Sequence, residues 1–415
     1  MYYFFGAGNN CSGALKFFGK ENVIAIVDNN ESKKGTLFEE VPIISFDEFQ
    51  EKYQTETVVI TAYIKSDEII NQLQKADVLD YFVCPYMQSG FWSANKIVKM
   101  WNLAEKTIFA IYERNPITDI ILHEIEMQKG EKCKVIYLDE EERKIGSSIE
   151  ADVLLIISEE GIRTDIFPKC KKIFDLYREM EDEKIASYDY LKQYKNIHKG
   201  EDCFVLGNGP SLRKEDLDRL HRIGAISMAS NGIYKVFDAT KWRPNYYVIG
   251  DAIVYEKNKD MLPMDATYFI RDFYGNSGLD GNVAWYNSKG EKFYPGYPKF
   301  SDDLVLGVYG GRTVTYDMLQ IAVYMGFRNI YLIGVDFSWG EDGKSTHFYA
   351  SKQEDRMVKN AVEYRDEVEH AYLSARYYAD SHDINIYNAT RGGNLEVFER
   401  KNLDDVLALI EKAGS

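Results

Sequence analysis

The chain has 415 residues, of which 45% are hydrophobic and 28% are charged, and it carries a formal net charge of −16. This length predicts two or three domains, and this composition excludes a wholly disordered protein. The acidic balance argues against general nucleic-acid binding, which needs clustered cations, although backbone amides in a locally positive pocket can still hold a mononucleotide.

The cysteines and the first residues indicate a cytoplasmic protein. The five cysteines are scattered and include no Cys-x-x-Cys pair, so neither a disulfide framework nor a zinc site is expected. The start, MYYFFGAGNN, lacks the basic region of a signal peptide, and no apolar run approaches about 18 residues. We therefore expect no membrane span, while peripheral membrane association and oligomerisation stay open.

A small Rossmann-like domain is predicted over residues 1–90. Short apolar runs alternate here with amphipathic stretches, which is typical of a parallel sheet with crossover helices. The predicted strands lie at residues 2–5, 23–27, 42–44 and 58–61.

The first predicted strand runs into a glycine motif. Gly6, Gly8 and Gly13, with Asp28 at the end of the second strand, approximate the fingerprint of a dinucleotide-binding loop. The spacing GxGxxxxG departs from GxGxxG, so an idle or regulatory Rossmann-like fold is expected as readily as cofactor binding. We do not predict an NAD enzyme.

Residues 91–190 predict either a separate small α/β segment or the second half of the N-terminal domain. Buried strands are expected near residues 108–112, 135–138 and 153–158. The charged run at 139–144 is expected to form a solvated loop or helix face.

Residues 191–415 predict a larger α/β domain with parallel strands. A polar linker at 192–202 precedes it, and residues 273–311 are rich in tyrosine and glycine with little periodicity, which suggests a long functional loop or lid. The predicted strands are 203–206, 225–228, 246–249, 330–333 and 384–387, and the predicted helices are 314–325 and 352–381.

Four of these strands end in polar residues. Asn208, Asn231, Asp251 and Asp336 each stand at or just beyond the end of a predicted strand. In an open parallel sheet, ligands bind outside the carboxyl ends of the strands. The four polar tips therefore predict one ligand-binding crevice.

The GNGPS segment after the first of these strands predicts an anion site. Gly207 and Gly209 allow a sharp turn and close backbone approach, Pro210 can open the next helix, and Ser211 adds a hydroxyl. Exposed amides at a helix start would then cradle a phosphate. A tight turn without a ligand is the alternative, and Asn208 favours the ligand because a plain turn does not need its side chain.

Two arginines in glycine-rich loops are candidates for a phosphate clamp. Arg312 stands where the 273–311 stretch meets a helix start, and it could equally pair with an acidic residue. Arg391, in the loop NATRGGN, is the second choice.

Asp336 and His347 are candidates for proton transfer or metal binding, because a strand-tip carboxylate stands eleven positions before a histidine. The alternative assigns Asp336 to a turn cap and His347 to a hydrogen-bonded loop. The remaining five histidines are expected to be surface or packing residues.

Several segments together resemble a known domain over about residues 200–395. They are VLGNGPSL (205–212), NGIY (231–234), YVIGD (247–251), MGFRNIYLIGVDF (325–337) and THFY (346–349). This set resembles the domain shared by motility accessory factors, which are flagellin glycosyltransferases, and MptE-like 6-hydroxymethylpterin diphosphokinases. It is also similar to bacterial sialyltransferases that use CMP-activated sialic acid, which implies a Rossmann-like, GT-A-variant fold. The first 90 residues resemble the small Rossmann-like domain of some surface-polysaccharide enzymes.

The resemblance implies a nucleotide donor bound over GNGPS and Asn231. Two departures from the sialyltransferases stand out. In the sialyltransferases the general base is the second histidine of a His-Tyr-x-x-His run. His347 matches the first histidine of this run, whereas Ser351 stands at the position of the second. Their catalytic arginine matches Arg312 only with a shift of one residue.

A bacterial glycosyltransferase of surface glycan or flagellin is the first hypothesis, with a nucleotide sugar of CMP-nonulosonate type as donor and a glycan or glycoprotein as acceptor. Arg312 would stabilise the leaving phosphate, His347 or Asp251 would take the acceptor proton, and Thr313 and Tyr349 would contact the sugars. No cofactor or metal is required. The nucleotide is expected at Gly207, Asn208, Gly209, Pro210, Ser211, Asn231 and Asp336.

Two other hypotheses stay open. A pyrophosphokinase would use ATP and Mg²⁺, with Asp251 and Asp336 as metal ligands, although no Walker-type lysine is present. A nucleotide-binding protein without catalysis would explain Ser351 best.

Overall fold

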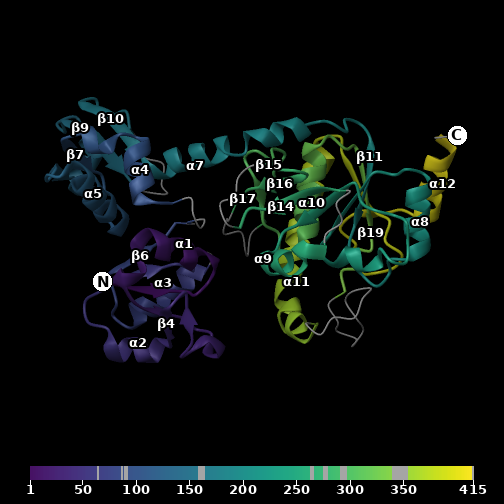
Figure 1. Cartoon of the computed structure of the whole chain (residues 1–415), viewed down its shortest axis with the longest axis horizontal. Helices are drawn as coiled ribbons and strands as arrows, with labels where there is room; N and C mark the ends of the chain where they lie inside the picture. Colours follow the sequence, from purple (N-terminus) through teal and green to yellow (C-terminus); the bar gives the residue numbers. More distant parts are fainter. Residues whose placement is uncertain are drawn as a thin grey trace. The chain divides into compact units, whose positions relative to one another are not determined.

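The computed structural model describes residues 1–62, 65–85, 87, 92–157, 164–261, 266–273, 279–289, 297–338 and 354–413. The chain divides into two compact units, Met1–Lys184 and Ile185–Ser415, and each is treated by itself (Figure 1). The predicted division into 1–90, 91–190 and 191–415 remains a prediction. Among the described residues, no helix has both the length and the apolarity that crossing a bilayer requires.

The first sheet of unit 1 has the order β3-β4-β2-β1-β5-β6, parallel except for the β3–β4 pair. Its strands are β1 (Tyr2–Phe5), β2 (Val23–Val27), β3 (Leu37–Phe38), β4 (Val41–Ile44), β5 (Thr57–Ile60) and β6 (Tyr81–Val83). The helices are α1 (Asn9–Phe18), α2 (Phe46–Lys52) and α3 (Ser66–Lys75). The parallel crossovers predicted for this segment are therefore confirmed.

A second, four-stranded parallel sheet lies in the same unit, in the order β10-β9-β7-β8. Its strands are β7 (Ile108–Ile111), β8 (Lys134–Tyr137), β9 (Ala151–Ile156) and β10 (Cys170–Asp175), and its helices are α4 (Ala94–Met100), α5 (Pro116–Lys129), α6 (Glu140–Ile145) and α7 (Leu176–Ala186). One buried apolar cluster includes residues of both sheets, among them Phe4 and Phe109. The charged run 139–144 supplies the N-cap Asp139 and most of α6, which buries no residue, as a solvated helix face would.

Unit 2 is built on a sheet of nine strands in its described residues, in the order β15-β16-β14-β13-β12-β11-β19-β20-β21. Every pair is parallel except β15–β16. The strands are β11 (Asp202–Leu206), β12 (Ser227–Ser230), β13 (Tyr246–Ile249), β14 (Thr267–Arg271), β15 (Leu279–Asp280), β16 (Val283–Tyr286), β19 (Asn329–Ile333), β20 (Asn385–Asn388) and β21 (Glu399–Arg400).

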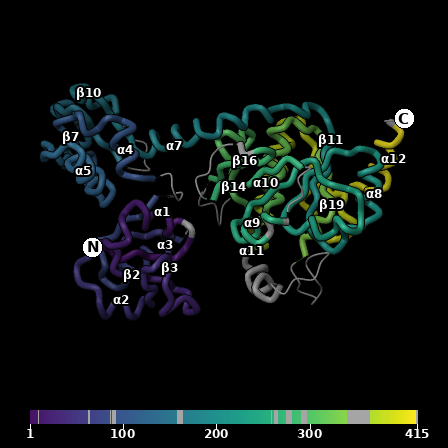
Figure 2. The backbone as a smooth tube through the Cα atoms, viewed as in Figure 1, coloured from purple at the N-terminus to yellow at the C-terminus, as the bar shows by residue number. Residues whose placement is uncertain are grey.

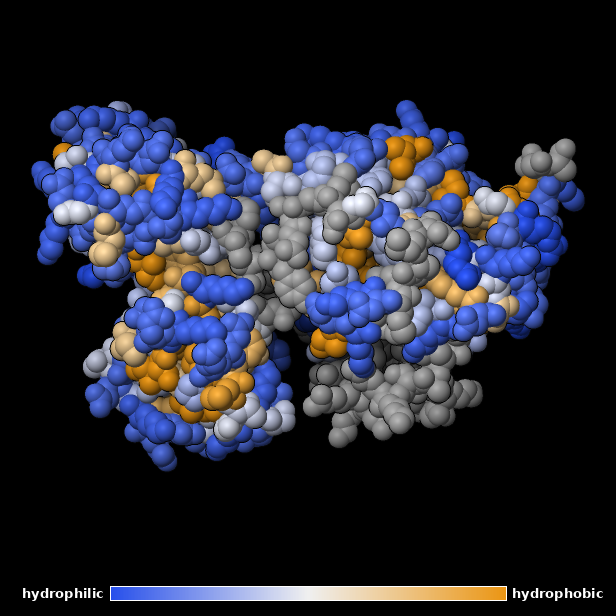
Figure 3. Space-filling model, in the orientation of Figure 1, coloured by the Kyte–Doolittle hydropathy of each residue, from blue (hydrophilic) through white to orange (hydrophobic). Residues whose placement is uncertain are grey.

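Helices cover both faces of this sheet (Figures 1 and 2). Side chains alternate along β11, so that Cys203 and Val205 join a core with α10 (Val314–Tyr324) and α11 (Glu354–Ser381). Phe204 and Leu206 join the opposite core with α8 (Lys214–Arg222) and α12 (Leu403–Ala413). Two buried faces explain why these strands are continuous apolar runs. Hydrophilic residues predominate on the surface that Figure 3 shows.

Three element predictions are wrong in detail. The stretch 273–311 is not one long loop, because it contains β15, β16 and the two short strands β17 (Ser288–Lys289) and β18 (Val308–Tyr309). The linker predicted at 192–202 begins inside a 3-10 helix, Asp189–Tyr194. The helix after GNGPS begins only at Lys214, so Pro210 does not open it.

Candidate functional site

The carboxyl ends of the parallel strands of unit 2 meet at one edge of the sheet, called here the tip edge. The chain proceeds from β11 through β12, β13 and β14 in one direction, and β19 and β20 lie on the other side of β11. The order therefore reverses between β11 and β19. A crevice outside the strand ends is expected at such a reversal, and it is the usual ligand site of open α/β sheets.

Buried polar atoms without partners concentrate along this tip edge. Across the residues that the structure describes, six such side-chain atoms belong to residues at or beside the strand tips. They are Asn208 Oδ1, Asn231 Oδ1, Arg271 Nε, Asn287 Nδ2, Asn287 Oδ1 and Asp317 Oδ1. An unsatisfied buried polar group costs on the order of 1–3 kcal/mol, so a cluster of them is a strong marker of a ligand site.

The glycines of GNGPS serve the contact between the tips of β11 and β19. The amide of Gly207 donates to Ile333 O and that of Gly209 donates to Gly334 O, both at 2.8 Å. A Cβ atom on Gly209 would lie 1.8 Å from Oδ2 of Asp336. Glycine is thus required at 209 by protein packing.

Asp336 closes the other side of this loop. Its carboxylate accepts the Ser211 hydroxyl at 2.7 Å and the Ser211 amide at 3.2 Å. Asp336 is only 8% exposed, and burial raises the pKa of its carboxyl despite these hydrogen bonds. The amides of Gly207, Gly209 and Ser211 all have protein partners, so the predicted cradle of exposed amides is wrong.

The side chains of Asn208 and Asn231 offer a different kind of site. Asn208 Nδ2 donates to Ser230 O at 3.1 Å, which places the Asn208 side chain at the tip of β12. Asn231 has a left-handed φ of 51°, and its carbonyl accepts the hydroxyl of Tyr247. Their Oδ1 atoms have no partner within the described chain, so they can accept hydrogen bonds from a ligand.

Asp251 and Thr313 both cap helices at the tip edge. Asp251 Oδ1 accepts the Val254 amide at 2.9 Å and begins α9 (Ala252–Asn258), and its side chain is exposed. Thr313 Oγ1 accepts the Thr315 amide at 3.3 Å and begins α10. The capping role fixes both side chains without excluding a contact to a bound substrate.

Both arginine candidates are paired with carboxylates. Arg312, with a left-handed φ of 59°, donates through Nε to the buried Glu367 of α11, and its guanidinium lies over the ring of Tyr364. The alternative of an acidic partner is therefore realised for Arg312. Arg391 contacts Asp216 at 2.8 Å and also Asp404. The assignment of Arg391 as a phosphate ligand is therefore wrong, because two carboxylates occupy its guanidinium.

Three residues of the predicted site, His347, Tyr349 and Ser351, lie outside the described residues. Their roles remain predictions.

The sequence did not single out an ion pair beneath β13. Arg271 Nη2 and the Tyr286 hydroxyl both donate to Asp317 Oδ2 at 2.6 Å. Asp317 is fully buried on α10, where nearly all neighbours are apolar. A lone carboxylate in an apolar helix was the available signal, because such a charge needs a buried partner.

The glycine motif of unit 1 is also explained by internal contacts. Asp28 Oδ2 accepts the Ala7 amide and the Lys33 ammonium, each at 2.9 Å. A Cβ atom on Gly13 would lie 1.7 Å from Met87 O. Asp28 therefore holds the loop itself, and whether this loop also takes a ligand stays a prediction.

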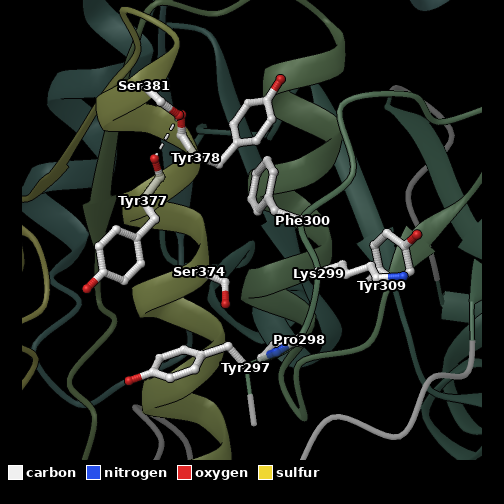
Figure 4. A pocket seen from close by; sticks show the side chains of 9 residues that line it. All are labelled: Tyr297, Pro298, Lys299, Phe300, Tyr309, Ser374, Tyr377, Tyr378 and Ser381. Carbon is white, nitrogen blue, oxygen red and sulfur yellow. Dashed lines mark hydrogen bonds between the residues drawn. The ribbon is translucent and has the colours of Figure 1, made fainter.

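An open aromatic groove of about 490 Å³ lies beside α11 in unit 2 (Figure 4). Tyr297 and Tyr377 are exposed at its sides, and Phe300 stacks on Tyr378 with ring centroids 4.7 Å apart. Tyr309 also lines the groove, three positions before Arg312. Flat apolar faces with hydroxyl groups suit the stacking of sugar rings.

No group of three or more metal-ligating side chains occurs in the described part of the chain. The proposed Mg²⁺ ligands Asp251 and Asp336 follow β13 and β19, which β12 and β11 separate. Three strand spacings amount to about 14 Å, whereas Mg²⁺ needs its ligand oxygens at about 2.1 Å. The strand order therefore speaks against one ion bound by both carboxylates.

Comparison with known families bears on this unit. Residues 176–342 match the family model described as 6-hydroxymethylpterin diphosphokinase MptE-like. The matched residues, called here the MptE-like domain, lie mostly in the C-terminal unit. The expected resemblance to the MptE-like family is confirmed, and the match extends from α7 past Asp336. The partnerless polar atoms of the tip edge thus lie in the MptE-like domain.

Among solved structures, this chain is similar to a MAf glycosyltransferase from Magnetospirillum magneticum AMB-1, at 14% identity and a TM-score of 0.34. The similarity covers 74% of this chain and 61% of the glycosyltransferase chain. This chain therefore spans less than two thirds of the length of that glycosyltransferase. No curated protein matches the chain.

Proposed function

We propose that the MptE-like domain binds an activated nucleotide at its tip edge and transfers the attached group to an acceptor, as a glycosyltransferase of bacterial surface glycan or flagellin. The observation that carries this proposal is the pair of buried, partnerless Oδ1 atoms on Asn208 and Asn231. They lie at the tips of β11 and β12, beside the point between β11 and β19 where the strand order reverses and where ligands of open α/β sheets bind.

The nucleotide contacts in this proposal are made by side chains. Base amino or ribose hydroxyl groups donate to Asn208 and Asn231, whose Oδ1 atoms otherwise pay the cost of burial without a bond. Asp336 cannot favour a phosphate beside Ser211 when it is ionised, since like charges repel. In this proposal the phosphate lies beside Arg312, away from Asp336.

Catalysis in this proposal rests on Arg312, Asp251 and His347. Glu367 orients Arg312 through Nε, and the outer side of the guanidinium stabilises the leaving phosphate. Asp251 has one oxygen on the α9 cap and a second for the acceptor proton, with His347 as the other base. Thr313, Tyr349 and the aromatic groove contact the sugars. We propose a CMP-nonulosonate donor and no metal.

A magnesium-dependent pyrophosphokinase is the second candidate, favoured by the family description matched at 176–342. The separation of Asp251 from Asp336 speaks against the metal site first expected for it. A non-catalytic nucleotide-binding protein is the third.

The test is a thermal-shift panel of CMP, UDP, GDP and ATP, each with and without Mg²⁺. A ligand at one hundred times its Kd stabilises the fold by about 2.7 kcal/mol. We expect CMP to raise the Tm without metal, Asn208→Ala to lose this shift, and Asn329→Ala to keep it. Asn329 is the matched control because it stands at the opposite end of β19, bonded to Asp202.

Other outcomes rank the candidates differently. A shift with ATP that requires Mg²⁺ would favour the pyrophosphokinase. No shift with any nucleotide would remove both enzymes as written and leave only a scaffolding role.

A further inference from the structure

The tip edge carries a second polar cluster at its β14–β16 end, around Arg271, Asp317 and Asn287. β14 is three strands and β16 four strands from β11. At one strand spacing each, these positions lie about 14 and 19 Å from the β11 tip. This cluster can therefore contact a different part of a ligand from the part at Asn208 and Asn231.

Arg271 connects the buried interior with the surface of the edge. Its Nη2 atom donates to Asp317 Oδ2 at 2.6 Å, and Asp317 has no exposed surface. The Arg271 side chain itself is 26% exposed. A guanidinium has five donors in a planar fork, so the bond to Asp317 leaves donors for a ligand.

A purely structural ion pair does not explain the cluster. Taking two charges out of water is repaid only when the remaining donors and acceptors are also satisfied. Here, within the described residues, Arg271 Nε and Asp317 Oδ1 lack hydrogen-bond partners. Nδ2 and Oδ1 of Asn287 lack them as well. These are the atoms that a polar ligand would satisfy.

The backbone around Asn287 holds its side chain in place. Val308 donates its amide to Asn287 O at 3.0 Å, and Gly307 has a left-handed φ of 103°. A Cβ atom on Gly307 would approach Asn287 Nδ2 to 3.1 Å. The Asn287 residue is 1% exposed, and its side chain presents a donor NH2 group and an acceptor oxygen, which suits a sugar hydroxyl.

The cluster also adjoins the proposed catalytic segment. A Cβ atom on Gly250 would lie 3.1 Å from Asp317 Oδ2 and 3.5 Å from Arg271 Nη2. Because Gly250 has no side chain, the ion pair of Arg271 and Asp317 can lie beside the backbone that precedes Asp251.

We infer that Arg271, oriented by Asp317 and Tyr286, recognises an anionic group of the ligand, a carboxylate or a phosphate, while Asn287 binds a neighbouring hydroxyl. The inference rests on the proposed function, because it places the anion on the sugar side of the same edge. Arg271 and Asn287 are then residues that determine specificity, and Asp317 is a positioning residue.

The experiment compares three sugars that differ only at carbon 6: glucose, glucuronate and glucose 6-phosphate. Their affinities for the full-length protein are measured by ligand-observed NMR titration. We expect at least one anionic sugar to bind on the order of tenfold more tightly than glucose, since charge-assisted hydrogen bonds are among the strongest. Comparing glucuronate with glucose 6-phosphate then separates a carboxylate from a phosphate site.

The variants test the residues directly. Arg271→Gln combined with Asp317→Asn removes both charges together and should abolish the preference. Arg271→Lys keeps the charge beside Asp317 and should weaken the preference, which keeps the test valid if the double variant fails to fold. Arg328→Gln is the control. Arg328 immediately precedes β19 and pairs with the exposed Asp383.

Equal binding of all three sugars to the wild type, or a preference that survives in the folded Arg271 variants, would overturn the inference. The nucleotide panel decides the proposed function separately. Nucleotide binding without a preference for anionic sugars leaves the proposed function standing and removes the Arg271 site. A preference for anionic sugars without nucleotide binding would remove the proposed function and leave the Arg271 site standing.

Discussion

Asp336 holds two neighbouring strand tips together through hydrogen bonds to Ser211. Its carboxylate takes the space that a side chain at 209 would need, so Gly209 and Asp336 form one packed unit. The same carboxylate carries its charge in a buried setting, where water cannot stabilise it. Gly209 and Asp336, which the sequence predicts to bind the nucleotide, thus act first as packing and hydrogen-bonding partners.

Replacing Asp336 by Asn should change how stability depends on pH. Burial raises the pKa of Asp336 in the folded state above its ordinary value of 3.8. The folded state then binds more protons than the unfolded state between these two values, so this group's contribution to stability is full below pH 3.8 and is lost as the pH rises through the folded pKa. Asp336→Asn should therefore gain stability relative to the wild type as the pH rises from 4 to 7.

Urea unfolding at both pH values measures this gain. Asp383→Asn is the control, since it removes a carboxylate that is 84% exposed. If the wild type instead gains relative to Asp336→Asn as the pH rises, the folded-state pKa is lowered and our account of Asp336 is wrong.

At the scale of elements, α5 shows how a short sequence signal sets a helix boundary. Asn115 Oδ1 accepts the amides of Ile117 and Thr118 at 3.0 Å, and Thr118 Oγ1 accepts the Asn115 amide at 3.0 Å. Pro116 stands at the first helical position, where it lacks an amide that would have no partner. The buried face of α5 then packs into the core of unit 1.

Asn115→Ala should destabilise unit 1 by about 1 kcal/mol, because two amides of α5 lose their acceptor. Chemical denaturation followed by circular dichroism measures this loss. The matched control is Asp139→Ala, which removes an equivalent capping box from α6, a helix without buried residues. We expect α6 to fray with a smaller loss of global stability. An equal loss in both variants would contradict the view that core packing couples the α5 cap to unit stability.

At the scale of the whole molecule, the chain contains two units with separate internal cores. The unit boundary at residues 184 and 185 falls within α7, and the MptE-like match begins at the first residue of the same helix. The nine-stranded sheet, its covering helices and the tip edge all belong to the second unit.

A fragment of residues 176–415 should therefore fold by itself, since it keeps both cores of the large sheet. We expect one cooperative thermal transition and the same nucleotide-induced shift in Tm as in the full chain. A fragment without a cooperative transition would show that unit 1 is needed for folding. A folded fragment that has lost the shift would show that unit 1 contributes to binding.

The sequence alone determined the class of fold and five neighbouring strands of the large sheet of unit 2, β13, β12, β11, β19 and β20, because apolar runs such as 246–249 and 330–333 need no tertiary information to be recognised. It also placed Asn208, Asn231 and Asp251 at strand ends. Only the tertiary structure decided what fills the space between them: the loop amides bond to β19, Arg312 pairs with Glu367, and Arg271 meets Asp317 across 46 positions of sequence. Local periodicity records which residues are buried, whereas hydrogen-bond partners depend on which distant segments the sheet order brings together.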